Sequence, residues 1–300
     1  MKSMRKMLIF LHFIINIYGV IAQTPATDPL HWNKNTMFSD EFDGNRNANW
    51  LEKRGEAGGA ISIPQNITYG SENERQFIRF IGEIVNGIPY TGGIVTGRTL
   101  SGHLGLGYGY YEIEARVLQT PGIQSGLWPA FWIWHQSYTS PYWYEELDIF
   151  EPNNCEVKAN QHHVHFWYNP DESIYPDVVE KLFPDDMSKY NVDMSQWHKY
   201  AVEWLEGRVT FYLDDDLFFV IRDRHTPFHQ NTNVLIDLQT DKFDTPSWWV
   251  VCPPDIDNGP LGSFDVNYFR YYQSKYDCGT TVTEILNYNT FNYAVKKSSV

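Results

Sequence analysis

The feature that most constrains the fold of this sequence is a two-residue alternation of apolar and polar side chains, which recurs between turns and never gives way to a helical pattern. Residues 109–117 show it, with Glu112, Glu114 and Arg116 at every second position. Successive side chains of a β-strand point to opposite faces, so this run predicts a strand with one packed and one solvated face. Roughly a dozen such strands predict an all-β fold of two packed antiparallel sheets.

The same pattern predicts how some strands pair. We expect 93–96 to pair with 109–117, and 197–204 to form a hairpin with 209–214. Other strands are expected at 37–44 (ending in a turn), 161–168, 234–238 and 264–272. By contrast, 45–73 and 168–193 are rich in Gly, Asn, Ser, Pro or Asp and predict loops.

One predicted strand carries three carboxylates in the run Glu146-Leu147-Asp148-Ile149-Phe150-Glu151. Glu146 and Asp148 are two residues apart and share a face, whereas Glu151 would point the other way in a regular strand. A β-bulge near Ile149 or Phe150 would return Glu151 to the shared face. Two carboxyl groups about 5–6 Å apart suit a reaction in which one attacks a sugar and the other protonates the leaving oxygen. The alternative is a set of ordinary solvated acids on an edge strand.

Aromatic residues flank this acidic run. Trp128 and Trp132 lie upstream in the motif G-L-W-P-A-F-W, and Trp143 lies within Tyr142-Trp143-Tyr144. A buried core would be expected to supply Leu and Val here, so several Trp and Tyr beside paired carboxylates indicate platforms for sugar rings. Each Trp has a core position as its alternative, because alternation buries about half of them.

The motifs G-L-W-P-A-F-W and E-L-D-I-F-E together resemble the family 16 glycoside hydrolases, which include laminarinases, lichenases, β-agarases and κ-carrageenases. The spacing E-x-D-x-x-E is similar to that of laminarinase-like and agarase-like members. Residues 37–44, 198–204 and 264–272 also resemble family motifs, so the resemblance spans about 37–273. It implies a concanavalin-type β-jelly roll, with the acidic strand on the floor of a concave groove.

The resemblance also implies roles for individual residues. Glu146 would be the nucleophile, Glu151 the acid/base and Asp148 an assisting group. Catalysis would need no cofactor. A structural calcium ion on the convex face would be held by Glu41 and Asp265, the alternative being a surface acid pair without an ion. The expected substrate-binding residues are Trp128, Trp132, Trp143 and His165.

The function implied is that of a secreted, retaining endo-β-glycosidase that cleaves a polysaccharide, with β-1,3-glucan of the laminarin type as the first choice. A red-algal galactan hydrolase, similar to agarases or porphyranases, is the second. A non-catalytic carbohydrate-binding protein and a transglycosylase also stay open. The expected protein is a monomer whose partner is its polysaccharide.

Composition narrows the range of other partners. The formal net charge is −14, from 37 acidic and 23 basic residues, which disfavours nucleic acid and anionic membranes. It also argues against a heavily sulfated polysaccharide. The three cysteines, Cys155, Cys252 and Cys278, allow one disulfide and one thiol, with the pairing open.

The N-terminus is typical of a secretory signal. Lys2, Arg5 and Lys6 precede the apolar stretch 7–22, and cleavage after Ala22 is expected, with an N-terminal anchor as the alternative. The protein is therefore expected to be secreted or periplasmic. The expected organisation is a signal peptide at 1–22, a flexible lead at 23–36, the jelly-roll domain at 37–273 and a C-terminal tail at 274–300.

Overall fold

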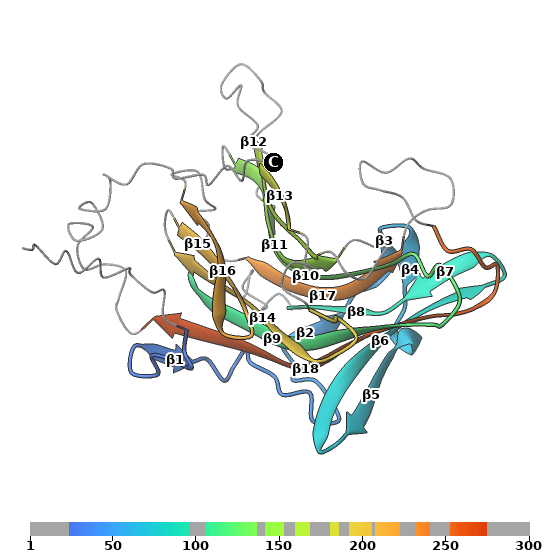
Figure 1. The fold of residues 1–300 in the computed structure, drawn as a ribbon, viewed down its shortest axis with the longest axis horizontal. Helices are drawn as coiled ribbons and strands as arrows, with labels where there is room; N and C mark the ends of the chain where they lie inside the picture. Colours follow the sequence, from blue (N-terminus) through green and yellow to red (C-terminus); the bar gives the residue numbers. More distant parts are fainter. Residues whose placement is uncertain are drawn as a thin grey trace, which may run out of the picture.

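The computed structural model describes residues 24–96, 106–136, 142–152, 160–168, 181–185, 192–205, 208–222, 232–240 and 253–274. Of residues 57, 135–136, 142–145, 160–168, 181–185, 219 and 221–222 it describes the backbone alone. The described chain forms two β-sheets stacked as two layers (Figure 1), with a single turn of 3-10 helix at Pro64–Asn66. None of the residues described here forms a helix long and apolar enough to cross a membrane.

The larger sheet contains eleven strands. They are β1 (Trp32–Lys34), β3 (Gly55–Ala57), β4 (Ala60–Ser62), β5 (Ile67–Glu72), β6 (Arg75–Val85), β7 (Ile88–Thr91), β9 (Gly109–Gln119), β14 (His198–Leu205), β15 (Arg208–Leu213), β16 (Asp216–Arg222) and β18 (Gly259–Ser274). Their order is β16-β15-β14-β9-β18-β6-β7-β4-β3, with β1 beside β18 and β5 beside β6. All of these pairs are antiparallel except β4 with β7.

The smaller sheet contains seven strands and carries the acidic run. They are β2 (Trp50–Glu52), β8 (Gly93–Thr96), β10 (Leu127–Gln136), β11 (Tyr142–Pro152), β12 (Asn160–Tyr168), β13 (Lys181–Asp185) and β17 (Asn233–Thr240). Their order is β13-β12-β11-β10-β17-β8-β2, so β11 lies between β10 and β12. In Figure 1, β11, β12 and β13 bend away from the part of the sheet formed by β10 and β17.

The hydrophobic core lies between the two sheets and fixes the position of β11. Leu147, Ile149 and Phe150 are buried in it. The Phe150 ring stacks on Phe264 of β18, with centroids 5.5 Å apart, and contacts Tyr200 of β14 at 4.2 Å. Rings packed in this way contribute beyond the area that they bury, so the acidic strand is held firmly against the larger sheet.

The all-β prediction is confirmed, but three predicted features of the first hundred residues are wrong. Residues 93–96 form β8, which pairs with β17 and β2 in the smaller sheet and not with 109–117. Residues 37–44 make one isolated bridge, Asp40 to Phe269, in place of a strand. The predicted loop 45–73 contains β2, β3, β4 and β5. These segments are short or rich in polar residues, so they show no clear two-residue alternation. They form strands because they pair with other strands in the folded protein.

Two further segments also differ from expectation. Residues 32–34, in the predicted flexible lead, form β1 and pair with the end of β18. Residues 181–185, in the predicted loop 168–193, form β13 at the edge of the smaller sheet. The hairpin predicted at 197–204 and 209–214 is confirmed as β14 and β15, and β17 and β18 confirm the predicted strands 234–238 and 264–272.

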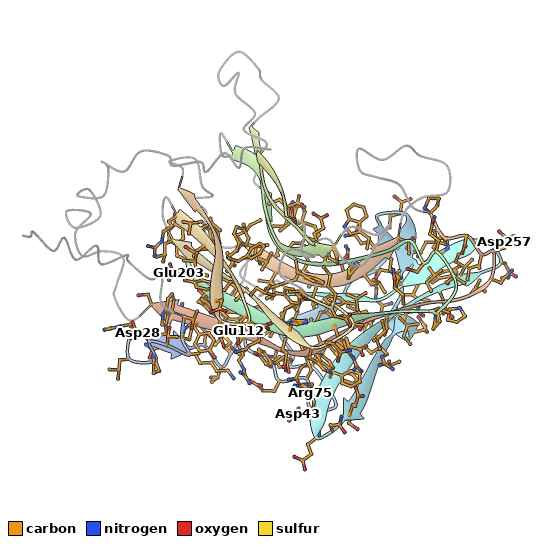
Figure 2. The ribbon with its side chains drawn as sticks, in the orientation of Figure 1. Asp28, Asp43, Arg75, Glu112, Glu203 and Asp257 are labelled. Carbon is orange, nitrogen blue, oxygen red and sulfur yellow. The ribbon has the colours of Figure 1, made fainter. Side chains whose placement is uncertain are left out.

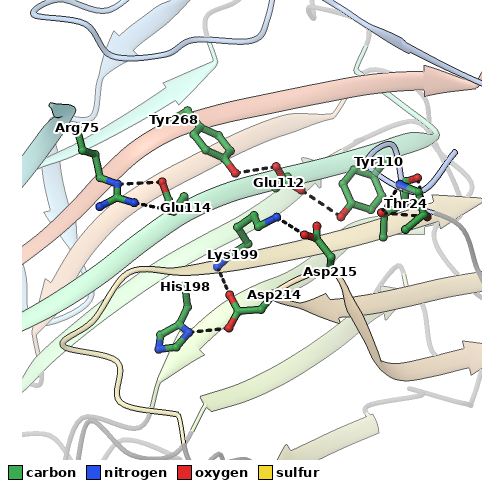
Figure 3. Close-up of polar contacts among 11 residues, drawn as sticks. Thr24, Arg75, Tyr110, Glu112, Glu114, His198, Lys199, Asp214, Asp215 and Tyr268 are labelled. Carbon is green, nitrogen blue, oxygen red and sulfur yellow. Dashed lines mark hydrogen bonds and ion pairs between the residues drawn. The ribbon is translucent and has the colours of Figure 1, made fainter. Parts of the chain in front are cut away.

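The outer face of the larger sheet, directed away from the core, is built from polar networks rather than separate solvated side chains. Glu112 is 6% exposed and accepts hydrogen bonds from Tyr268 (2.8 Å) and Tyr110 (3.2 Å). Figure 2 shows Glu112 and Glu203 over this sheet, and Figure 3 shows the contacts of Glu112. Burial raises the pKa of the Glu112 carboxyl, and the Tyr268 hydroxyl partly offsets that effect. The prediction of a solvated face is therefore wrong for Glu112.

Candidate active site

The predicted bulge is present in β11. Against β10, Trp132 lies opposite Asp148 and Phe131 lies opposite Phe150, so Ile149 is the additional residue. The register of β11 against β12 shifts in the same interval, between Asp148 and Glu151. Ile149 and Phe150 both face the core because of this bulge.

The three carboxylates consequently lie on the outer face of the smaller sheet, opposite the core residues of β11. Asp148 is buried, whereas Glu146 and Glu151 are partly exposed. Burial raises the pKa of the Asp148 carboxyl well above its usual value. The charges of Glu146 and Glu151, a hydrogen bond with Glu146 and the charge of Asp237 act in the same direction. The protonated form of Asp148, located between the two glutamates, is therefore favoured.

A tryptophan orients the second glutamate. The indole Nε1 of Trp128 donates a hydrogen bond to Oε1 of Glu151 at 2.9 Å. This contact bridges β10 and β11 on the outer face and limits the rotamers of Glu151. The structure thus shows that Trp128 positions a carboxylate, whereas its predicted contact with substrate stays a prediction.

Trp132 and Trp134 lie beside the carboxylates in β10. Trp132 is opposite Asp148 and Trp134 is opposite Glu146 in the strand register. Their ring centroids are 6.4 Å apart with an interplanar angle of 49°, and both side chains are partly exposed. Trp134 was not among the residues predicted for the site, although its two-residue offset from Trp132 places it on the same face.

A fourth carboxylate and a lysine also lie on this face. Asp237 of β17 is fully buried and accepts a hydrogen bond from Nε1 of Trp132 at 2.8 Å. Its other oxygen forms an ion pair with Nζ of Lys53, which directly follows β2. Sequence reasoning missed both residues. The signal for Asp237 was a single acid in the apolar run 234–238, whereas Lys53 is brought to this face by tertiary structure alone.

A comparison with known protein families agrees with this geometry. The model described as glycosyl hydrolases family 16 matches residues 82–239, more than half of the 300 residues. The chain belongs to glycoside hydrolase family 16. The matched residues include β10, β11 and β17, which carry the three carboxylates, the tryptophans and Asp237.

Two relatives that are similar to part of this chain are named as endo-acting enzymes. An endo-1,3-1,4-beta-glycanase, EglC, from Rhizobium meliloti (strain 1021) is 29% identical over 154 residues, which are 50% of this chain and 29% of the relative. A glucan endo-1,3-beta-glucosidase from Cryptopygus antarcticus is 23% identical over 183 residues, 54% of this chain and 61% of the relative. The matches thus span less than two thirds of either relative.

The fold of this family 16 chain is similar to that of solved glycoside hydrolases. The laminarinase catalytic domain from Thermotoga maritima MSB8 superimposes with a TM-score of 0.61 at 19% identity. The superposition covers 82% of this chain and 100% of the laminarinase domain. The predicted β-jelly roll is thereby confirmed.

Two predicted substrate-binding residues can be placed by their backbones alone. His165 of β12 lies opposite Glu146, and Trp143 lies within β11. Their side chains are outside the described residues, so their contacts with substrate stay predictions. Residues 1–22, the tail 275–300 and the three cysteines also lie outside the described chain.

The residues predicted for calcium do not fit a shared metal site. Both oxygens of Asp265 accept hydrogen bonds from Arg79 (2.7 and 2.8 Å), and Arg116 adds a third at 3.0 Å. Glu41 is bound by Arg270 (3.0 and 2.7 Å) and by Lys34. Guanidinium groups thus hold the oxygens that a calcium ion would need, and different arginines hold each carboxylate.

Proposed function

We propose that this chain is a retaining endo-β-glycosidase. The observation that carries the proposal is the bulge at Ile149, which gathers Glu146, Asp148 and Glu151 on the outer face, with Glu151 held by Trp128. Double displacement needs one carboxylate as nucleophile and a second carboxyl group as acid/base, and Glu146 and Glu151 can supply these two groups.

In the first step, a carboxylate oxygen of Glu146 bonds to the anomeric carbon while the bond to the leaving oxygen breaks. Glu151 gives its proton to that oxygen, and a glycosyl ester remains on Glu146. In the second step, Glu151 takes a proton from water, whose oxygen attacks the anomeric carbon and releases Glu146. Burial raises the pKa of Asp148 and so favours its protonated form, which donates a hydrogen bond to Glu146 and stabilises it as the leaving carboxylate.

β-1,3-Glucan of the laminarin type is the proposed substrate. One relative is named a glucan endo-1,3-beta-glucosidase and the other an endo-1,3-1,4-beta-glycanase, and the solved structure reported above is a laminarinase domain. The partly exposed Trp132 and Trp134 support binding of sugar rings beside the acids.

We also propose that residues 1–22 direct export of the protein. Mass spectrometry of secreted protein that begins at residue 23 would support the export proposal, and retention of residues 1–22 would contradict it.

The first experiment is a product assay on laminarin, mixed-linkage glucan, agarose, porphyran and carrageenan. Wild-type protein is expected to release oligosaccharides from laminarin, with the β-anomer formed first in NMR spectra. Glu146→Gln is expected to lose at least about 10³-fold in kcat, because an amide is a poor nucleophile. Glu74→Gln, in the exposed turn between β5 and β6, is the matched control and should keep full activity.

Other outcomes of this assay have distinct meanings. Products from agarose or porphyran alone would overturn the glucan assignment and keep the mechanism. Initial release of the α-anomer would overturn retention. An absence of cleavage together with retained binding would instead support a carbohydrate-binding protein.

A further inference from the structure

The pair formed by Asp237 and Lys53 is a polar feature of this face that the proposed reaction does not use. The Asp237 side chain is 0% exposed, yet it lies on the same face as the catalytic carboxylates. Its two oxygens are held by different partners, Trp132 on one side and Lys53 on the other. A buried carboxylate is costly unless it is paired and hydrogen-bonded, so this arrangement favours one conformation of all three side chains.

The geometry of the pair restrains the Trp132 ring. Trp132 lies directly opposite Leu235, and its indole reaches Asp237 along the diagonal of the β10–β17 register. The Lys53 ammonium lies 5.5 Å from the centroid of the Trp132 ring, within the range of a cation–π contact. The indole N–H and the ring are thus both held by groups outside β10.

Lys53 is itself fixed by the backbone around it. Its N–H donates to the carbonyl of Gly93 at 2.8 Å, and its carbonyl accepts from the Ser62 hydroxyl at 3.1 Å. A Cβ at Gly93 would come within 2.5 Å of the Asp237 Cβ. Glycine at position 93 therefore provides the space in which Asp237 packs below the lysine.

The location and charge of the group indicate what it would bind. Asp237 is on β17, two strands from β11, which corresponds to roughly 10 Å at the usual spacing of strands. The charge of Lys53 is matched by Asp237, and the neighbouring catalytic residues are acidic. An anionic substituent on a sugar would meet no net positive charge from this pair, whereas hydroxyl groups can accept from the ammonium.

We propose that Lys53 and Asp237 are positioning residues that hold Trp132 as the platform of a subsite for an uncharged sugar, on the β17 side of the catalytic strand. The inference rests on the proposed glycosidase function. It adds a selectivity for sugars without sulfate or carboxylate groups at this position.

The test compares the steady-state kinetics of variants on laminarin. Lys53→Met is expected to raise KM about 10-fold and to change kcat less than about 3-fold, because binding is lost equally in the ground and transition states. Lys53→Arg should recover most of the lost affinity. Arg54→Met is the matched control, since Arg54 is 68% exposed and pairs with Glu52, and it should match the wild type.

Trp132→Phe distinguishes positioning from a direct effect of charge. Phenylalanine keeps an aromatic ring but has no N–H for Asp237. If the pair acts through Trp132, Lys53→Met should cost much less in the Trp132→Phe background than in the wild type. Lys53→Met alone leaves the buried Asp237 carboxylate without its ion-pair partner and can destabilise the fold. The double variant Lys53→Met with Asp237→Asn removes both charges, and its Tm shows whether it is folded. It is expected to show the same raised KM as Lys53→Met.

The inference would be overturned if KM were unchanged both in Lys53→Met and in Lys53→Met with Asp237→Asn. It would also be overturned if the effects of Lys53→Met and Trp132→Phe were fully additive. Either result would leave the proposed function intact. Wild-type activity confined to porphyran or carrageenan would overturn the neutral-sugar subsite. An inactive wild type on every glycan would instead overturn the proposed function, and the inference with it.

Discussion

At the scale of single residues, the site is built around one carboxyl group, Asp148, that is buried between two others. Asp148 is buried beside Glu146 and Glu151, and burial together with their charges raises its pKa. Such a group is useful for catalysis and costly for folding, because the unfolded chain would ionise it at neutral pH. Strained or destabilised groups of this kind are common where activity competes with stability.

Asp148→Asn should therefore raise the stability of the fold at neutral pH. In the wild type, the unfolded chain loses the Asp148 proton above about pH 3.9, whereas the raised pKa lets the folded chain hold it to higher pH, so the free energy of unfolding falls as pH rises. Asparagine removes this dependence. We expect a higher Tm for the variant at pH 7, no difference below about pH 3.5, and a kcat about 10²-fold lower.

Thermal unfolding followed from pH 3 to pH 8 checks this prediction, provided that both proteins unfold reversibly. A variant that is less stable than the wild type at every pH would contradict the raised pKa of Asp148. Asp257→Asn, on the surface segment labelled in Figure 2, is a control in which a carboxylate distant from the site is changed.

At the scale of elements, β11 joins the chemistry to the core. Its outer face bears the acids, and its inner face packs Phe150 against β14 and β18 of the other sheet. The bulge at Ile149 makes both arrangements possible, because it directs Ile149 and Phe150 toward the core and Glu151 toward the outer face. The position of Glu151 is consequently coupled to the packing of the Phe150 ring.

Phe150→Ala should lower the free energy of unfolding by about 3–5 kcal/mol, the usual cost of removing a buried aromatic ring. Activity should fall as well, because the cavity would let the bulge and Glu151 shift. Urea denaturation and kcat on laminarin measure the two effects. Phe150→Leu should cost less in both, and Ile88→Ala, at an exposed position of β7, should change neither. If Phe150→Ala were strongly destabilised but kept full activity, the position of Glu151 would not depend on the packing of Phe150, and the prediction would be wrong.

At the scale of the whole molecule, the two faces of the sandwich use carboxylates differently. The outer face of the smaller sheet brings acids close to one another for chemistry. The outer face of the larger sheet instead pairs several of its acids with basic or hydroxyl groups, as in the Asp265 network with Arg79 and Arg116 and in the contacts of Glu112 and Asp214 in Figure 3. A cation is thus supplied to Asp265 by the chain itself.

Stability is accordingly predicted to be independent of calcium. Excess EDTA should leave Tm unchanged, and added calcium should not raise it. Arg79→Met should cost about 2–3 kcal/mol, because a buried carboxylate loses a bidentate partner. The exposed Arg54→Met serves as the control and should cost less than about 0.5 kcal/mol. A Tm that falls with EDTA and returns with calcium would restore the metal site predicted from the family resemblance.

The sequence by itself determined the all-β class, the strand that carries the acids, the spacing of Glu146, Asp148 and Glu151, and the need for a bulge between them. These are local properties, because a period of two residues decides which face a side chain takes. The family resemblance had the same local basis in contiguous motifs. Trp134 was within reach of this reasoning, since it shares the face of Trp132.

Only the tertiary structure decided which strands became neighbours. It moved 93–96 to the smaller sheet, joined 32–34 to β18, and buried Glu112 under tyrosine hydroxyls. It also brought Lys53 to Asp237, 184 positions away in the chain. Periodicity assigns a side chain to a face but carries no information about the strand that lies beside it, because pairing depends on contacts between distant segments.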